Sequence, residues 1–588
     1  MTGWMTKPLS WLKHQPEQRL MIILAIVAGL GSGAAAVVLK KLIELIGGCL
    51  TGWFDASWNN LLLLVYPGVG MLLSLLFVRY VVKDDIGHGV TKVLFSISRN
   101  NSRIRSHNMW SSLLSSSVTI GFGGSVGAEA PIVYTGAAIG SNVARSLGLS
   151  YRQMTILLCC GAAGAVAGIF KAPMAGILFC LEILLFNISM SSILPLLLSS
   201  VTATTVSYLF LGREVPFTST VDAFAMGNIP YYILLGLLCG FVSLYFLRTT
   251  LSLEDRIKKI NNPFKRWAVC ASMLGVLIFL FPPLFGEGYD SLGHMLQGHP
   301  DSVLDNAVFA AIFQYKWVIP IYFALALVLK VFAMSFTNAG GGVGGTFGPT
   351  LIVGGIAGFI LARTVNLMGF HALPEANFAL VGMAGLMAGV MQAPMTAIFL
   401  IAEITGGYSL LLPLIIVSAI SFATMRAFEP FSIYSKRLAK SGDLITHNSD
   451  RAVLTLLQTS DLVETDFTAV RLDDTLGDLV RAVARSTRNL YPVLDDAGIY
   501  RGYIGLDDIR KIMFDKDKYD TTKLYTLMKN APATVQSTDR MDSVMDKFDK
   551  TGAWNLPVVD EDGRYIGYVS KSKIFSSYRQ RLQDVSCD

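Results

Sequence analysis

Long apolar runs alternate with short polar breaks up to about residue 440. Three of these runs, Met21 to Leu39, Tyr231 to Leu247 and Trp317 to Phe336, approach the roughly 20 residues that a helix needs to cross a bilayer. Other runs are shorter and interrupted by glycine, which predicts tilted and half-way helices. Irregular backbone at membrane depth survives only where protein or a watery cavity satisfies its polar groups, so we expect the glycine breaks to face an interior pathway.

After about Ala439 the pattern changes. Charges become dense, no apolar run is long enough to span a membrane, and short apolar strands alternate with helical patterns. Two segments, starting at Asn489 and Asn555, share the order strand, acidic glycine turn, strand, helix. A helical stretch precedes each one, at Thr475 to Ser486 and at Met541 to Lys550. The tail is therefore predicted to hold two β-α-β-β-α modules.

The apolar region repeats itself. The stretch GSVGAEAPIVYTGAAIG from Gly124 is spelled almost like GVGGTFGPTLIVGGIAG from Gly342, and each is followed by an Ala-Pro-Met turn, at Pro173 and Pro394. Matching glycine and proline breaks in two halves mark the place where broken helices meet near the middle of a bilayer. We expect an ion-binding site there.

Composition supports a membrane protein. The chain has 588 residues, of which 52% are hydrophobic and 15% charged, so most of it must lie in lipid. The net charge of +6 comes from dispersed basic residues, which indicates membrane topology and not nucleic-acid binding. The first basic residues, Lys7, Lys13 and Arg19, precede an apolar run without a cleavage site, so this end is expected to be a retained cytoplasmic flank. The seven cysteines have no metal-like spacing.

These patterns predict the following organisation: a cytoplasmic N-terminal segment at 1–18, a transmembrane domain at 19–440 with halves at about 19–212 and 228–440, a linker at 441–462, and two modules at 463–516 and 531–582.

The two tail modules resemble a tandem pair of CBS domains. Such modules pair through their sheets and can hold an adenosine ligand with a Ser or Thr and an Asp that follow the last strand. Here the first module offers Gly505 and Asp508 and the second offers Ser570 and Lys573, so neither has the complete pair. The resemblance favours a scaffold for dimer assembly, and leaves an adenine nucleotide bound by Asp508 and Ser570 as the alternative.

The membrane part resembles the CLC family of chloride channels and chloride/proton exchangers in four motifs. The family's G-[KR]-E-G-P, G-x-F-x-P, G-S-G-I-P and late tyrosine correspond here to Gly127-Ala128-Glu129-Ala130-Pro131, Gly345-Thr346-Phe347-Gly348-Pro349, Gly87-His88-Gly89-Val90-Thr91 and Tyr434. The resemblance implies an all-α polytopic fold of two inverted repeats with re-entrant helices, plus a cytoplasmic α+β CBS pair. It also implies a homodimer in the cell membrane, with one anion pathway per subunit and both chain ends in the cytoplasm.

By the same correspondence, the resemblance implies that the anion is bound by His88, Gly89, Gly127, Ala128, Thr346, Phe347, Gly348 and Tyr434. Physical chemistry agrees, because a helix N-terminus offers unpaired N–H donors and about half a positive charge. Oriented amides and hydroxyls can replace part of the water around chloride and still release it, whereas a full cation would hold it too long. Chloride is thus the expected cargo, and no cofactor or metal is required.

Glu129 lies within one of these anion-binding turns. An ionised carboxylate there can occupy the anion position itself until it is protonated or swings away, so Glu129 is predicted to be a gate with pH-dependent opening. Glu182 and Glu403, which follow the two Ala-Pro-Met turns at equivalent places, are predicted to satisfy buried helix ends.

Three departures from the family pattern affect the functional prediction. Exchangers often carry a glutamate as inner proton station after the Glu182 position, but this chain has Ile183, which cannot titrate. His88 replaces a serine that usually touches the central anion, and we hypothesise that protonated His88 strengthens anion entry from the cytoplasm. Ala128 replaces a basic residue near the outer mouth, which weakens the attraction of external anions.

The sequence therefore predicts a passive, gated chloride channel, with a chloride/proton antiporter of the same family as the alternative. A CBS-containing divalent-cation transporter is a remote alternative, because few acids lie in the apolar runs. No helix carries the His-Glu-x-x-His pattern of an intramembrane metalloprotease, so an enzyme is not expected.

Overall fold

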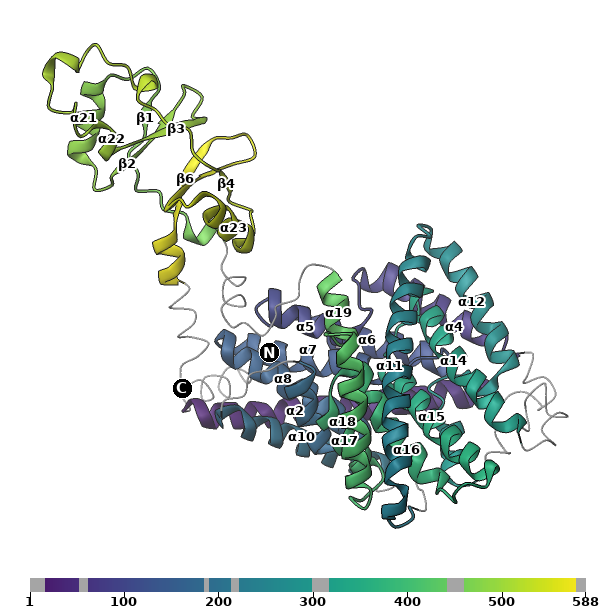
Figure 1. Cartoon of the computed structure of the whole chain (residues 1–588). Helices are drawn as coiled ribbons and strands as arrows, with labels where there is room; N and C mark the ends of the chain where they lie inside the picture. The colour runs from purple at the N-terminus through teal and green to yellow at the C-terminus, as the bar shows by residue number, and fades with distance from the viewer. Residues whose placement is uncertain are drawn as a thin grey trace, which may run out of the picture. The chain divides into compact units, whose positions relative to one another are not determined.

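The protein divides into two compact units, residues 1–444 and 445–588 (Figure 1). The computed structural model describes residues 16–51, 62–184, 190–212, 221–298, 317–440 and 459–577. Nearly all of the predicted N-terminal segment and most of the predicted linker lie outside these ranges. Each unit is described by itself.

The first half of the membrane unit is helical, as the apolar runs predict. Its helices are α2 (Glu17–Thr51), α4 (Tyr66–Leu76) with its π-helical continuation η1 (Phe77–Val82), α5 (Gly89–Arg99), α6 (Ser111–Gly121), α7 (Glu129–Leu147), α8 (Tyr151–Phe170), α9 (Pro173–Glu182) and α10 (Met190–Leu211).

The second half follows the same plan. Its helices are α11 (Ile229–Lys258), α12 (Pro263–Leu280), α13 (Tyr289–Leu296), α14 (Val318–Ala339), α15 (Phe347–Met368), α16 (Glu375–Met391), α17 (Pro394–Ile404), α18 (Leu411–Phe428) and α19 (Ile433–Lys440). Within the described residues, eight helical segments are long and apolar enough to cross a membrane. Helices α9 and α17, of 10 and 11 residues, are too short to do so.

Equivalent helices pack in the same way in both halves. Helices α2, α8 and α10 contact one another, as do α11, α16 and α18, and α7 packs on α8 as α15 packs on α16. The two latter crossings are backbone to backbone: a methyl group on Gly161 would meet the backbone of Gly136, and one on Gly382 the backbone of Gly354. Glycine at these four places allows each broken helix to lie directly against its neighbour, and the expected fold of two repeats with short, broken helices is confirmed.

The tail contains two three-stranded sheets. Each has a parallel pair followed by an antiparallel pair, in the orders β1-β2-β3 and β4-β5-β6. The strands and helices are β1 (Val470–Arg471), α21 (Leu476–Arg485), β2 (Leu490–Leu494), β3 (Tyr500–Gly505), α22 (Leu506–Ile509), β4 (Val535–Gln536), α23 (Met541–Thr551), β5 (Asn555–Val559) and β6 (Tyr565–Ser570). The two predicted modules and their leading helices are present.

One feature of the tail departs from the expected order. The backbone of Glu464 exchanges two hydrogen bonds with that of Tyr568, and Leu462 and Val463 pack into the core of the second module. Residues that precede the first module along the chain therefore pair with the sheet of the second module. Apolar residues at this place fit either core, so local pattern does not reveal which sheet they join.

Candidate anion pathway

Two glycine turns, one from each repeat, are joined to each other. The N–H of Gly127 donates to the carbonyl of Gly345 at 3.0 Å, and the N–H of Gly345 donates back at 2.7 Å. Helix α7 starts just after the first turn and α15 just after the second, and at neither start does the side chain of the N-cap residue, Ala128 or Thr346, cap the helix. The first-turn amides of both helices therefore converge on one place in the protein interior, which is favourable for an anion.

The carboxylate of Glu129 occupies this place. Glu129 belongs to α7 and is 2% exposed, but its Oε2 accepts a hydrogen bond from the N–H of Gly348 in α15, at 3.1 Å. Its Oε1 accepts one from the hydroxyl of Tyr289, at 2.5 Å. An acid of one repeat thus sits on the helix N-terminus of the other, where a free anion would otherwise bind.

Tyr434 approaches the same region from α19. The hydroxyl of Thr346 lies 3.4 Å from that of Tyr434, and both residues are buried. The ring of Phe347 is buried against Phe170, with 5.3 Å between ring centroids. The structure therefore brings Tyr434, Thr346, Phe347 and the gate region together, while their roles in anion binding stay predictions.

The motif Gly87-His88-Gly89-Val90-Thr91 also lies beside Glu129. A methyl group on Gly89 would meet the backbone of Ala130 and, at 3.0 Å, the Cβ atom of Tyr134, so the start of α5 packs directly on the first turn of α7. His88 precedes α5 with a left-handed backbone, at a φ of 54°. Its side chain turns to Glu254, with Nε2 at 3.7 Å from the carboxylate, and Glu254 is paired with Arg437 at 2.6 Å.

This environment disfavours a charged His88. The residue lies outside the candidate spans, and burial lowers its pKa to about 4; Arg437 adds to this effect, whereas Glu254 opposes it. Burial thus disfavours the charged imidazole, and the effect of protonated His88 on anion entry stays a prediction.

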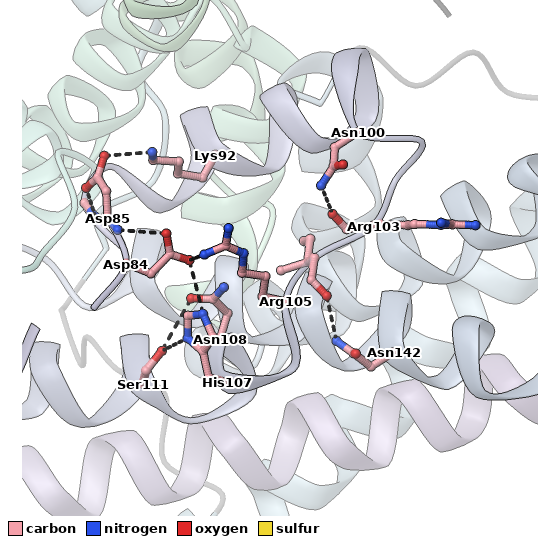
Figure 2. A network of polar contacts seen from close by, with 12 residues as sticks. Asp84, Asp85, Lys92, Asn100, Arg103, Arg105, His107, Asn108, Ser111 and Asn142 are labelled. Carbon is pink, nitrogen blue, oxygen red and sulfur yellow. Dashed lines mark hydrogen bonds and ion pairs between the residues drawn. The ribbon is translucent and has the colours of Figure 1, made fainter. Parts of the chain in front are cut away.

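A polar network fixes the segment that leads to His88 (Figure 2). Asp84 receives both the guanidinium of Arg105, at 3.2 Å, and Nε2 of His107, at 3.1 Å. The other ring nitrogen of His107 lies 3.2 Å from the hydroxyl of Ser111 in α6. Because Asp85 pairs with Lys92 at 2.7 Å, the turn is also tied to α5 itself.

Glu182 and Glu403 cap each other's repeat. Glu403, near the end of α17, accepts the N–H groups of Met174 and Ala175 at the start of α9, both at 3.0 Å. Glu182, at the end of α9, accepts the N–H groups of Met395 and Thr396 at the start of α17, at 2.9 and 2.7 Å. The prediction that this pair satisfies helix ends is confirmed. Ile183 is buried next to it, with an apolar side chain.

Three residues near the gate were missed by the sequence analysis. They are Tyr289, which holds Glu129, Glu287, whose Oε1 accepts the N–H of Ala128 at 3.0 Å, and Lys330, which is fully buried in α14. Lys330 could have been found, because a lysine inside the apolar run Trp317 to Phe336 is expensive unless it has a function. For Glu287 the only local signal is its position between two glycines.

The two candidate nucleotide residues of the tail already have partners. The hydroxyl of Ser570 donates to Glu464 at 2.6 Å, and Asp508 pairs with Lys529 at 2.5 Å. A negatively charged Glu464 beside Ser570 is unfavourable for a phosphate. Adenine-nucleotide binding at these residues remains a prediction.

The fold and the site together define a class: a multi-pass membrane protein in which two repeats direct helix N-termini to one interior place that is favourable for an anion. Comparison with known proteins specifies it further. The profile of the family described as voltage gated chloride channel matches residues 69–426, and the CBS domain profile matches residues 460–515 and 524–579. The chain belongs to this family of anion-transporting membrane proteins, which is the CLC family that the motifs indicated, and it carries a CBS pair.

Individual relatives are distant. The chain is 29% identical to the chloride channel protein CLC-e of Arabidopsis thaliana over 68% of its length, but it spans only 59% of that relative. It is 27% identical to the H(+)/Cl(-) exchange transporter ClcA of Vibrio cholerae, with 72% of this chain and 89% of the relative covered. A solved slow cyanobacterial Cl-/H+ antiporter has the same fold, with a TM-score of 0.61 at 22% identity, over 72% of this chain and 97% of that one.

Proposed function

We propose that this protein is a chloride/proton antiporter in which Glu129 carries the proton and competes with chloride for one position. The observation that carries the proposal is the seat of the Glu129 carboxylate on the Gly348 amide, 3.1 Å away. A carboxylate leaves such a seat when it is protonated, and chloride can then take its place. The alternation of a proton and an anion at one position couples their movements.

The comparisons favour exchange over the passive channel that the sequence suggested. The channel prediction rested on Ile183, which replaces a family glutamate. However, a relative that is aligned over 72% of this chain is named as an H(+)/Cl(-) exchange transporter, and a solved protein of this fold is named as a Cl-/H+ antiporter. Because Ile183 is apolar and buried, we propose that the inner part of the proton route uses water or another side chain.

The test uses the purified full-length protein in liposomes. With an outward chloride gradient and no initial proton gradient, chloride efflux should drive protons into the vesicles and acidify their lumen. Glu129→Gln should abolish this proton movement and leave chloride flux intact or larger, while Glu44→Gln, an exposed acid on α2, should behave like the wild type. Chloride flux without proton movement in the wild type would overturn the antiport proposal and favour a channel.

We further propose that the protein is a homodimer of the cell membrane, with its N-terminus and tail in the cytoplasm. The support is that the short helices α9 and α17 leave apolar side chains uncovered: Met174 is 38% exposed and Met395 47%. A second copy would cover such surface. Cross-linking of cysteine substitutions at these two methionines in vesicles tests the contact. Protease access to the tail in right-side-out cells tests the orientation.

A further inference from the structure

A second carboxylate lies beside the gate and repeats its geometry. Glu129, carried by α7, sits on the N-terminus of α15 through the amide of Gly348. Glu287, carried by the segment before α13, sits on the N-terminus of α7 through the amide of Ala128, at 3.0 Å. Both converging helix ends are thus occupied by an acid, and Ala128 is one of the amides that the family resemblance assigns to the anion.

The turn that carries Glu287 is held from several sides. Gly286 and Gly288 flank Glu287 with φ values of 57° and 90°, in a region that favours glycine. The N–H of Gly286 donates to the carbonyl of Gly123, just before the first glycine turn, at 3.0 Å. The position of this carboxylate is therefore built into the backbone.

Lys330 fixes the same turn from α14. Its ammonium donates to the carbonyl of Gly286 at 3.0 Å and to that of Leu284 at 3.4 Å. Burying a lysine costs free energy. Here the ammonium is compensated by hydrogen bonds to two backbone carbonyls that lie close to Glu287 in the chain. The positive charge of Lys330 attracts a negative charge at Glu287.

The charged and titratable groups that face Glu287 come from four elements. They are Glu129 of α7, Tyr289 of α13, Lys330 of α14 and Lys40 of α2. Two carboxylates so close together repel each other, because like charges in a desolvated site are only weakly screened. A change of charge on Glu287 must therefore be felt at the gate.

The surroundings of Glu287 also indicate toward which face of the membrane it lies. Lys40 lies 23 residues along α2 from Glu17, since 40 minus 17 is 23, and this corresponds to about 35 Å of helix. With the N-terminus in the cytoplasm, as proposed above, Lys40 lies toward the outer face. Tyr434, in contrast, belongs to α19, the last helix of the membrane unit among the described residues. Lys40 acts on both acids, which associates the pair Glu129 and Glu287 with the outer part of the pathway.

We propose that Glu287 is a second, proton-sensitive lid on the outer side of Glu129. Its carboxylate accepts the hydrogen bond from the N–H of Ala128, so an incoming anion cannot bind to this amide. A proton from the outer solution forms an O–H bond on Glu287, the hydrogen bond from Ala128 is released, and this N–H then donates to the arriving chloride. The proposal rests on the proposed anion route past Glu129, but it holds for coupled and uncoupled transport alike.

The experiment measures labelled chloride uptake by the full-length protein in liposomes, with external chloride titrated at an external pH of about 5.5 and about 7.5. In the wild type, the external chloride concentration for half-maximal uptake should rise with external pH. In Glu287→Gln this concentration should rise less with external pH, because Glu129 alone still responds to it. At the higher pH it should be lower than in the wild type by about tenfold, the effect of one hydrogen bond to a charged group.

Two further variants make the test specific. Asp290→Asn removes an exposed acid three residues away and should retain the wild-type behaviour. Glu287→Asp keeps the charge but shortens the side chain, so the half-saturating chloride concentration should fall by about threefold while some pH dependence remains. Glutamine carries no charge, so a hydrogen bond from Ala128 to it is weaker than one to the carboxylate. If the glutamine variant does not fold, the aspartate variant tests the proposal.

Unchanged half-saturation in Glu287→Gln or in Glu287→Asp at both pH values would overturn the proposal, as would an equal change in Asp290→Asn. Failure of the antiport proposal has a different signature. In that case no proton accompanies chloride in the wild type, while the external chloride dependence of the Glu287 variants can still be measured and judged.

Discussion

Gly127 and Gly345 exchange two backbone hydrogen bonds, of 3.0 and 2.7 Å, at the point where the two repeats meet. This contact joins two segments more than two hundred residues apart and directs the N-termini of α7 and α15 to one place. Because neither glycine has a side chain, the turns lie close enough for Glu129 of one repeat to reach Gly348 of the other.

A side chain at this contact should separate the turns. In Gly345→Ala the new Cβ would meet the Cβ of Ala130 at 2.9 Å and its N at 3.0 Å. We expect a loss of about 1–3 kcal/mol of stability and of most chloride transport. Thermal unfolding in detergent and flux in liposomes measure both. The matched control is Gly407→Ala, whose Cβ meets nothing within 4 Å; equal losses in the two variants would contradict this role of the contact.

Tyr289 should hold the gate closed. Tyr289→Phe removes the 2.5 Å hydrogen bond to Glu129, and with it about 1.5–3 kcal/mol that favours the seated carboxylate. Chloride flux at neutral pH should therefore increase by about tenfold or more. Tyr245→Phe removes a hydroxyl that donates to the carbonyl of Val328 and is the control. Flux that stays the same or falls in Tyr289→Phe would show that the hydroxyl does not restrain Glu129.

Glu182 and Glu403 should each stabilise the start of the short helix in the other repeat. In Glu182→Gln the amides of Met395 and Thr396 should exchange hydrogen faster, and in Glu403→Gln those of Met174 and Ala175. Each loss of a charged cap should cost about 1–2 kcal/mol. Hydrogen exchange followed by mass spectrometry resolves the two segments, with Glu44→Gln as the reference variant. Faster exchange confined to the helix that carries the substitution would refute the reciprocal arrangement.

The ion pair between Arg488 and Asp466 should make the stability of the tail decrease in acid. A hydrogen bond from Arg488 holds the pKa of Asp466 below its usual value. An acid with a lowered folded-state pKa stabilises the protein above its unfolded pKa of about 3.9, and this contribution is lost as the pH falls through the lower folded value. Arg488→Gln should therefore increase hydrogen exchange around residues 464–470 at neutral pH, and the difference from the wild type should shrink as the pH falls through the lowered pKa of Asp466.

Arg510→Gln is the control for this prediction, because it breaks an exposed pair with Asp507 at 2.5 Å. Such surface pairs contribute little. A difference between Arg488→Gln and the wild type that persists in strong acid would point to the packing of Arg488 over the ring of Phe467 as the main contribution instead.

Much of the pathway could be predicted because it is encoded locally. The glycine turns, the acid within the first turn and the Ala-Pro-Met breaks are short patterns, and their recurrence in two halves implies that they meet. The crosswise caps could be predicted for the same reason, since Glu182 and Glu403 occupy equivalent places. The tail modules followed from alternation and turn residues, which depend only on neighbouring positions.

The sequence by itself therefore determined the class of the protein and its two repeats, and it singled out the acid that we propose as the gate, because each depends on short-range pattern and on self-similarity. Only the tertiary structure decided which groups surround that gate. Glu287 and Lys330 come from segments far along the chain, and the side chain of His88 meets Glu254 near the end of α11. A buried charge is identified by its partners in space, and no local pattern contains them.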